Sequence, residues 1–257
     1  MYIMDDYLSF NLPICKLDNG KFIIPKTCDR IWFDVGTSIN SPNGVQFLKR
    51  NENGFVVGFE PNPRMYFTIY SMYYMNENKW LLDNKHETAQ IEEKKRIKKQ
   101  KRQIFNDTEE FIKKEDYMNR YILIPTAISS TTGTLVMYNN KHEGSTSLER
   151  GWANNILDDT FKVNSDTLKK YIEMVPDRYE YIEHVKIDCE GHDIEVLKSC
   201  GDLIDKVAVF TIEDNNASSF LIKTGKFEFL ENQNGGISLI NIKYKHLLDK
   251  LDYFIRV

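Results

Sequence analysis

Four apolar segments of the sequence end in acidic side chains, and this repeated pattern constrains the fold more than any other feature. The segments read RIWFDV, GFVVGFE, HVKID and KVAVFTIED, and their acids are Asp34, Glu60, Asp188, Glu213 and Asp214. Continuous apolar runs of this length are typical of strands buried on both faces, as in a parallel sheet. Helix-like stretches separate them, so the alternation predicts an open α/β sheet that is mostly parallel.

The spacing of the first two acids indicates what the carboxyl edge of this sheet binds. Gly36 follows Asp34 in a short loop, and Glu60 lies 24 residues beyond Gly36. Ligands of open α/β sheets bind at the carboxyl ends of the strands, where an acid about 20 residues past a glycine loop accepts hydrogen bonds from ribose hydroxyls. We therefore expect Glu60 to bind a ribose, with a helix-capping or surface carboxylate as the alternative.

The first loop lacks the further glycines of a dinucleotide-binding fingerprint. Ser38 and Ser41 stand where that fingerprint has its second and third glycines. A pyrophosphate needs these glycines because it approaches backbone N–H groups at a helix N-terminus very closely. S-adenosylmethionine contains an adenosine and a sulfonium amino acid but no phosphate. The loop therefore favours S-adenosylmethionine over NAD, and an NAD oxidoreductase is the function we favour least.

Five segments of the chain carry a family resemblance. They read FDVGTSINSPNG, VVGFEPNP, ILIPTAISSTTGTLVMY, GSTSLE and VKIDCEGHDIEVLKSC. Together, and in this order, they resemble the FkbM family of S-adenosylmethionine-dependent methyltransferases. The resemblance implies a class I methyltransferase fold, which is a Rossmann-like, mostly parallel seven-stranded sheet flanked by helices. It also implies O-methyl transfer, often to sugar hydroxyls of glycans or to natural products.

The same resemblance implies which residues form the site. The S-adenosylmethionine would contact the first loop, the end of the second strand and two later positions, namely Asp34, Gly36, Thr37, Ser38, Glu60, Pro61, Asn62, Ala127 and Glu190. Asp188 and His192 are the candidate catalytic residues, because a hydroxyl acceptor must lose its proton and a carboxylate or imidazole can take it. The loop from Ser38 to Gly44 is longer than the family pattern, and we expect it to close over the methionine part.

Each catalytic candidate also has a structural alternative. Asp188 could cap the following helix, His192 could be packed at the start of that helix, and Glu190 could bind the cofactor's amino group or cap the helix. Asp188 with Glu213 and Asp214 could supply oxygens to a divalent metal, a reading we do not favour. The GSTSLE segment is expected on a loop near the acceptor cleft.

The remaining segments suggest a single methyltransferase domain over residues 1–257. An N-terminal extension over 1–29 contains a predicted hairpin around Asn19-Gly20. GTLVMY is predicted to be a strand, a Ser or Asp of VNSD is predicted to cap the next helix, and terminal strands are expected near the C-terminus. Residues 83–118 are densely charged and read as a helical or partly disordered insertion.

Charge and hydropathy limit the partners. The formal net charge of -4 argues against general attraction to nucleic acid, so an RNA methyltransferase would depend on the basic run Lys94–Arg102. A glycan or small-molecule acceptor is the favoured partner, and a non-catalytic nucleotide-binding module is a further alternative. The sequence has neither an apolar run long enough to span a membrane nor a signal segment, so we expect a cytoplasmic location. It makes no prediction about oligomeric state.

Overall fold

The computed structural model describes residues 17–38, 42–63, 65–66, 119–140, 146–152, 159–233 and 236–252. The predicted charged insertion over 83–118, with its basic run Lys94–Arg102, lies outside these ranges, as does the start of the N-terminal extension. No helix within the described ranges combines the length and apolar character needed to cross a bilayer.

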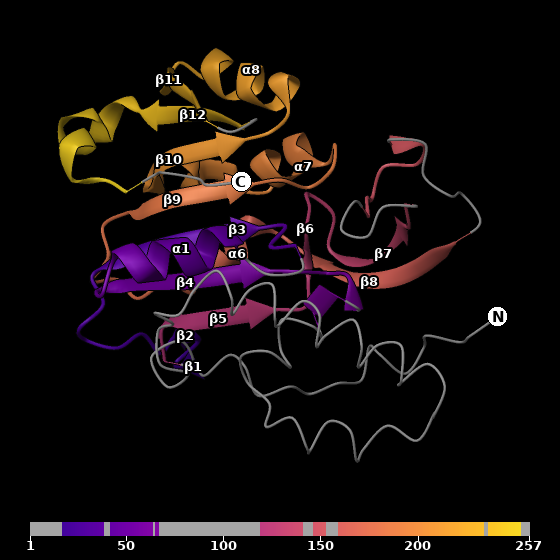
Figure 1. Ribbon diagram of the computed structural model, residues 1–257, viewed down its shortest axis with the longest axis horizontal. Coiled ribbons are helices and arrows are strands. Elements are labelled where there is room, and N and C mark those ends of the chain that lie inside the picture. Colours follow the sequence, from indigo (N-terminus) through magenta and orange to yellow (C-terminus); the bar gives the residue numbers. More distant parts are fainter. Residues whose placement is uncertain are drawn as a thin grey trace, which may run out of the picture.

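A seven-stranded sheet forms the centre of the molecule, in the order β11-β12-β10-β9-β3-β4-β5 (Figure 1). Five neighbouring strands are parallel, namely β10 (Val207–Ile212), β9 (Ile182–Ile187), β3 (Arg30–Val35), β4 (Gly54–Phe59) and β5 (Tyr121–Ile124). At one edge β12 (Gly236–Asn241) runs antiparallel to both β10 and β11 (Phe227–Gln233). The sheet is therefore mixed: the predicted parallel strands extend from β10 to the edge strand β5, and the antiparallel strands form the other edge.

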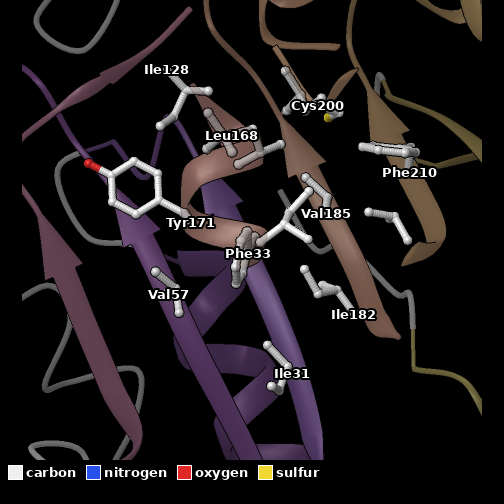
Figure 2. Packing of buried hydrophobic residues seen from close by; sticks show 14 of the residues in the cluster. Ile31, Phe33, Val57, Ile128, Leu168, Tyr171, Ile182, Val185, Cys200 and Phe210 are labelled. Carbon is white, nitrogen blue, oxygen red and sulfur yellow. The ribbon is translucent and has the colours of Figure 1, made fainter. Parts of the chain in front are cut away.

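Alternating side chains of β3 show how both faces of the sheet are covered. Ile31 and Phe33 pack on one face with residues of the helices α6 (Leu168–Glu173), α7 (Asp193–Lys198) and α8 (Asn215–Lys223), as Figure 2 shows for Leu168 and Tyr171. Trp32 points to the other face and stacks on Phe47 of α1 (Pro42–Arg50), with ring centroids 4.5 Å apart. Burying each of these side chains contributes about 1.5–3 kcal/mol.

Two of the described elements are 3-10 helices. The first, η3 (Gly201–Lys206), connects α7 to β10, and the second, η4 (Ile242–Lys250), follows β12. Tyr244 of η4 packs with Val209 and Ile240 in a smaller apolar cluster, separate from the main core.

A second sheet has three strands, β6 (Ala127–Ile128), β8 (Thr160–Asp166) and β7 (Gly133–Tyr138), in the order β6-β8-β7. It lies beyond the arrowheads of the parallel strands, at their carboxyl ends (Figure 1). The predicted GTLVMY strand is β7. The predicted helix cap was wrong, because β8 extends to Asp166 and the hydroxyl of Thr167 caps α6 by accepting a hydrogen bond from the Lys170 N–H at 3.3 Å.

The N-terminal hairpin is present where the Asn-Gly turn predicted it. Strands β1 (Leu17–Asp18) and β2 (Lys21–Phe22) are antiparallel. Asn19 and Gly20 have φ angles of 50° and 76°, in the left-handed region that such turns require. The expected long loop up to Gly44 was wrong in its second half. Its residues from Pro42 onward form the first turn of α1, where proline is well tolerated.

Candidate active site

A cavity lies where the carboxyl ends of β3, β4 and β9 face the three-stranded sheet. Its described lining residues are Val35, Gly36, Ser38, Phe59, Glu60, Pro61, Met65, Thr126, Ala127, Ile128, Met137, Thr146, Leu148, Asp188, Cys189, Glu190 and His192. Three of them are carboxylates, and this lining contains neither lysine nor arginine. β3 and β9 are adjacent strands from which the chain continues toward opposite edges, which is the position where open α/β sheets bind ligands.

The first loop turns tightly because of Gly36. This residue has a φ of 76°, and a Cβ atom placed on it would lie 2.0 Å from the carbonyl oxygen of Asp188. The N–H groups of Gly36 and Thr37 both donate to the carbonyl oxygen of Phe59, at 3.1 and 3.3 Å. Ser38 is also left-handed, with a φ of 57°. The loop therefore crosses the end of β4 and brings Ser38 next to Glu60.

Glu60 connects this loop to the end of β4. Its carboxylate is buried and accepts hydrogen bonds from the N–H groups of Ser38 at 3.1 Å and Asn62 at 2.8 Å, one at each oxygen. Burial raises the pKa of Glu60 to about 7, although the two N–H donors act in the opposite direction. An ionised carboxylate has about four acceptor sites, so each oxygen retains capacity for a ligand hydroxyl.

A buried lysine, which the sequence reasoning missed, holds two of the predicted acids together. The Lys186 ammonium lies 3.1 Å from Asp188 Oδ2 and 3.6 Å from Asp34 Oδ1, and it donates to the carbonyl oxygen of Gly36 at 2.7 Å. Burial by itself would lower the pKa of Lys186, but attraction to Asp188 and Asp34 raises it above its ordinary value. The sequence feature that could have revealed this lysine is a charged residue within an apolar strand.

Three predicted cofactor-binding residues lie behind the cavity and are not part of its lining. Asp34 is fully buried, and its Oδ2 accepts a hydrogen bond from the Gly44 N–H at 3.3 Å, at the start of α1. Thr37 is buried against Gly58. The Asn62 side-chain amide donates to Thr146 Oγ1 at 3.3 Å. These three side chains support the loops that carry the lining residues.

Asp188 lies in the lining and shares a hydrogen bond with Glu213. Burial opposes the ionisation of Asp188, but the adjacent Lys186 charge outweighs it and lowers its pKa. The pKa of Glu213 is raised to about 7, by burial and by repulsion from Asp188. Asp214 caps α8 by accepting the Asn216 N–H at 2.7 Å. Across the described ranges, no three His, Cys, Asp or Glu residues are grouped to hold a metal.

The turn after Asp188 is closed by Asp193, which the sequence reasoning also missed. One oxygen of its buried carboxylate accepts the Cys189 N–H at 2.9 Å, and the other accepts the Asp214 N–H at 3.2 Å. Burial raises the pKa of Asp193 to about 6. This carboxylate therefore joins the loops after β9 and β10.

The turn formed by residues 190–192 is left-handed at Glu190 and Gly191, with φ angles of 52° and 92°. Glu190 Oε2 accepts a hydrogen bond from the Trp152 indole N–H at 2.9 Å, and the Trp152 ring packs over Gly191. Next to it, His192 Nδ1 lies 2.7 Å from Glu149 Oε1. Glu190 therefore neither caps α7 nor points freely at the cavity. The partners Glu149 and Trp152 come from the loop over residues 146–152. Glu149 is part of the GSTSLE segment, and its neighbours Thr146 and Leu148 line the cavity.

A comparison with protein families shows to which family the chain belongs. The model of the methyltransferase FkbM domain matches residues 34–231, which is most of the chain and includes all the lining residues given above. No curated protein gave a match. The chain therefore belongs to the FkbM family of methyltransferases.

Proposed function

We propose that the protein transfers a methyl group from S-adenosylmethionine to a hydroxyl of a sugar, a glycan or a small molecule. The carrying observation is the cavity lining, which has three carboxylates and, among its described residues, neither lysine nor arginine. Such a lining suits a ligand with a sulfonium and an ammonium group and disfavours a pyrophosphate, which favours basic partners. The order of the central strands supports a class I, Rossmann-like arrangement.

The chain's own residues would hold this cofactor in two ways. The Glu60 carboxylate would accept the ribose hydroxyls, and the absence of a side chain at Gly36 would let the methionine part approach the backbone. Apolar side chains that include Met65, Met137 and Leu148 would cover the adenine, next to Pro61 and Ala127. The acids Asp188 and Glu190 line the same cavity and would face the positively charged end of the cofactor.

S-adenosylmethionine supplies an activated methyl group, so the protein mainly has to align the acceptor and receive its proton. Asp188 and His192 both line the cavity and are the two candidates for the proton acceptor. A panel of glycans, small alcohols and RNA with labelled S-adenosylmethionine would identify the acceptor. Label in RNA would favour the alternative in which Lys94–Arg102 binds phosphates. Cofactor binding without transfer to any acceptor would favour a non-catalytic module.

Glu60→Ala should weaken S-adenosylmethionine binding about 10- to 100-fold, because hydrogen bonds to a charged group contribute about 1.5–3 kcal/mol. Isothermal titration calorimetry on the full chain measures this directly. Asp202→Ala is the control, since Asp202 is an exposed acid and neither it nor its ion-pair partner Lys169 belongs to the cavity lining. Equal affinity of the wild type and Glu60→Ala would contradict the ribose role, and no binding by the wild type would overturn the proposed function.

The affinity for S-adenosylmethionine should rise about tenfold between pH 6 and pH 8 if only ionised Glu60 binds the ribose. The pKa of Glu60 is raised to about 7, so the carboxyl is mostly protonated at pH 6 and mostly ionised at pH 8. Calorimetry at both pH values tests this against Glu60→Gln, which cannot ionise. Glu213 titrates in the same range, so Glu213→Gln should retain the Glu60-dependent part. A similar pH slope in Glu60→Gln would assign the effect to another group.

A further inference from the structure

The described loop over residues 146–152, here called the docking loop, contacts both sides of the cavity. At its start, Thr146 Oγ1 accepts the amide N–H of Asn62, which follows β4. The Ser147 hydroxyl donates to the carbonyl oxygen of Glu190 at 2.6 Å, and the Trp152 indole donates to the Glu190 carboxylate. Glu149 lies between these contacts and reaches His192. The position of Glu149 is therefore fixed by the residues on either side of it.

The His192 ring is held at both nitrogens. Nδ1 lies 2.7 Å from Glu149 Oε1, and Nε2 lies 3.0 Å from Ser129 Oγ. An ionised carboxylate only accepts hydrogen bonds, so the Nδ1 atom must carry the proton in this pair. Ser129 Oγ accepts the Thr131 N–H at 3.3 Å, and with the ring proton on Nδ1 its hydroxyl donates to Nε2. Nε2 therefore carries the lone pair of the ring, and in the structure this lone pair accepts the Ser129 hydroxyl.

Asp188, the other candidate, is engaged differently. Its Oδ2 is paired with the buried Lys186 ammonium at 3.1 Å, and the carboxylate also shares a hydrogen bond with Glu213. Lys186 stabilises the ionised form and so lowers the pKa of Asp188, despite its burial. A carboxylate held in this way is a weak base. Asp188 is therefore better suited to balancing positive charge in the cavity than to removing a proton.

We propose that the acceptor hydroxyl takes the place of the Ser129 hydroxyl at His192 Nε2 and gives its proton to that atom, and that Glu149 is the positioning residue that fixes the ring in this tautomer. This inference rests on the proposed function. As the hydroxyl oxygen forms its bond to the methyl carbon, the bond from that carbon to sulfur breaks and its electron pair stays on sulfur. The hydroxyl proton moves to Nε2. The resulting imidazolium is stabilised by the Glu149 carboxylate and then loses its proton to water.

Other charged groups surround this histidine, and a test must separate them from Glu149. Glu195 lies on α7, the helix that begins directly after His192. Its carboxylate accepts hydrogen bonds from Ser130 and Lys198. Asp188 and Glu190 lie in the same cavity lining. Glu149 differs from all three because its oxygen is in direct contact with a His192 ring nitrogen. Glu195→Ala is therefore a matched control, since it removes a nearby negative charge without removing a ring contact.

The primary experiment reads the His192 tautomer by ¹⁵N NMR on the full chain without ligand, with His192→Asn used to assign the signals. The wild type should show a protonated Nδ1 and an unprotonated Nε2. Glu149→Ala should change the ring to the Nε2–H form, and Glu149→Asp should restore part of the Nδ1–H form. An Nε2–H ring in the wild type, or an unchanged tautomer in Glu149→Ala, would overturn the proposal.

Kinetics with the acceptor found in the panel give a second readout. Glu149→Ala should lower kcat about 10- to 100-fold, at or below the lower end of the roughly 100- to 10,000-fold contribution of a general base, because His192 itself remains, and Glu149→Asp should recover part of it. S-adenosylmethionine affinity by calorimetry should stay within about threefold in both variants, because Glu149 is not among the lining residues. An equal kcat loss in Glu195→Ala would overturn the specific role of Glu149. Absence of cofactor binding in the wild type would instead reject the proposed function.

Discussion

Replacing Lys186 by methionine should destabilise the folded protein by about 3–5 kcal/mol, the range for removing one partner of a buried ion pair. Lys186 is 5% exposed and its ammonium compensates the carboxylates of Asp34 and Asp188. Methionine keeps an unbranched side chain without the terminal ammonium, so it leaves the Asp34 charge buried without this partner. It also removes the hydrogen bond to the Gly36 carbonyl oxygen. Urea denaturation followed by circular dichroism measures the free energy of unfolding.

Two further variants separate charge from packing in this prediction. Adding Asp34→Asn to Lys186→Met should recover part of the lost stability, because the double variant no longer buries the Asp34 charge. Lys198→Met is the control, since Lys198 forms an exposed ion pair with Glu195 and its loss should change stability little. If Lys186→Met were as stable as the wild type, the buried charge cluster would have no structural role.

The local pattern predicts the central strands well because it reports burial directly. The apolar runs around Phe33 and Val57 correspond to β3 and β4, both of them buried. The antiparallel position of β12 depends on pairing with β10, which is distant in sequence. β6 has only two residues, and β8 pairs with it across a long connection. A local hydrophobic period carries no information about such long-range pairing, so the second sheet was not predicted.

The candidate site was likewise predictable only in part. Residues at strand ends, such as Gly36, Glu60 and Asp188, could be predicted to meet because parallel strands place their carboxyl ends together. Their roles were less predictable, since these depend on partners that only folding brings close. Glu149 contacts His192 although the two are 43 residues apart. Lys186 carried a visible signal, because a lysine between apolar residues of a buried strand requires buried anions nearby.

Gly36→Ala should destabilise the protein by about 2–5 kcal/mol and abolish detectable S-adenosylmethionine binding. Two costs add in this variant. A left-handed φ costs a non-glycine residue about 1–2 kcal/mol, and forcing an extra carbon into a packed site costs about 1–3 kcal/mol. The added Cβ would lie 2.0 Å from the Asp188 carbonyl oxygen, a backbone atom that cannot rotate away. Relief would require β3 and β9 to separate at the point where the cavity begins. Urea denaturation and calorimetry measure the two effects.

Gly20→Ala isolates the second cost, because the two glycines share the same φ of 76°. An alanine Cβ at position 20 would meet no atom within 4 Å, whereas at position 36 it would meet the Asp188 backbone. The backbone strain and the reduced freedom of the unfolded chain are therefore similar in both variants and cancel in the comparison. Gly36→Ala should be the less stable by the clash alone, and Gly20→Ala should bind S-adenosylmethionine like the wild type. Equal losses of stability in the two variants would mean that β3 and β9 separate at little cost, and the close contact at Gly36 would then not define the site.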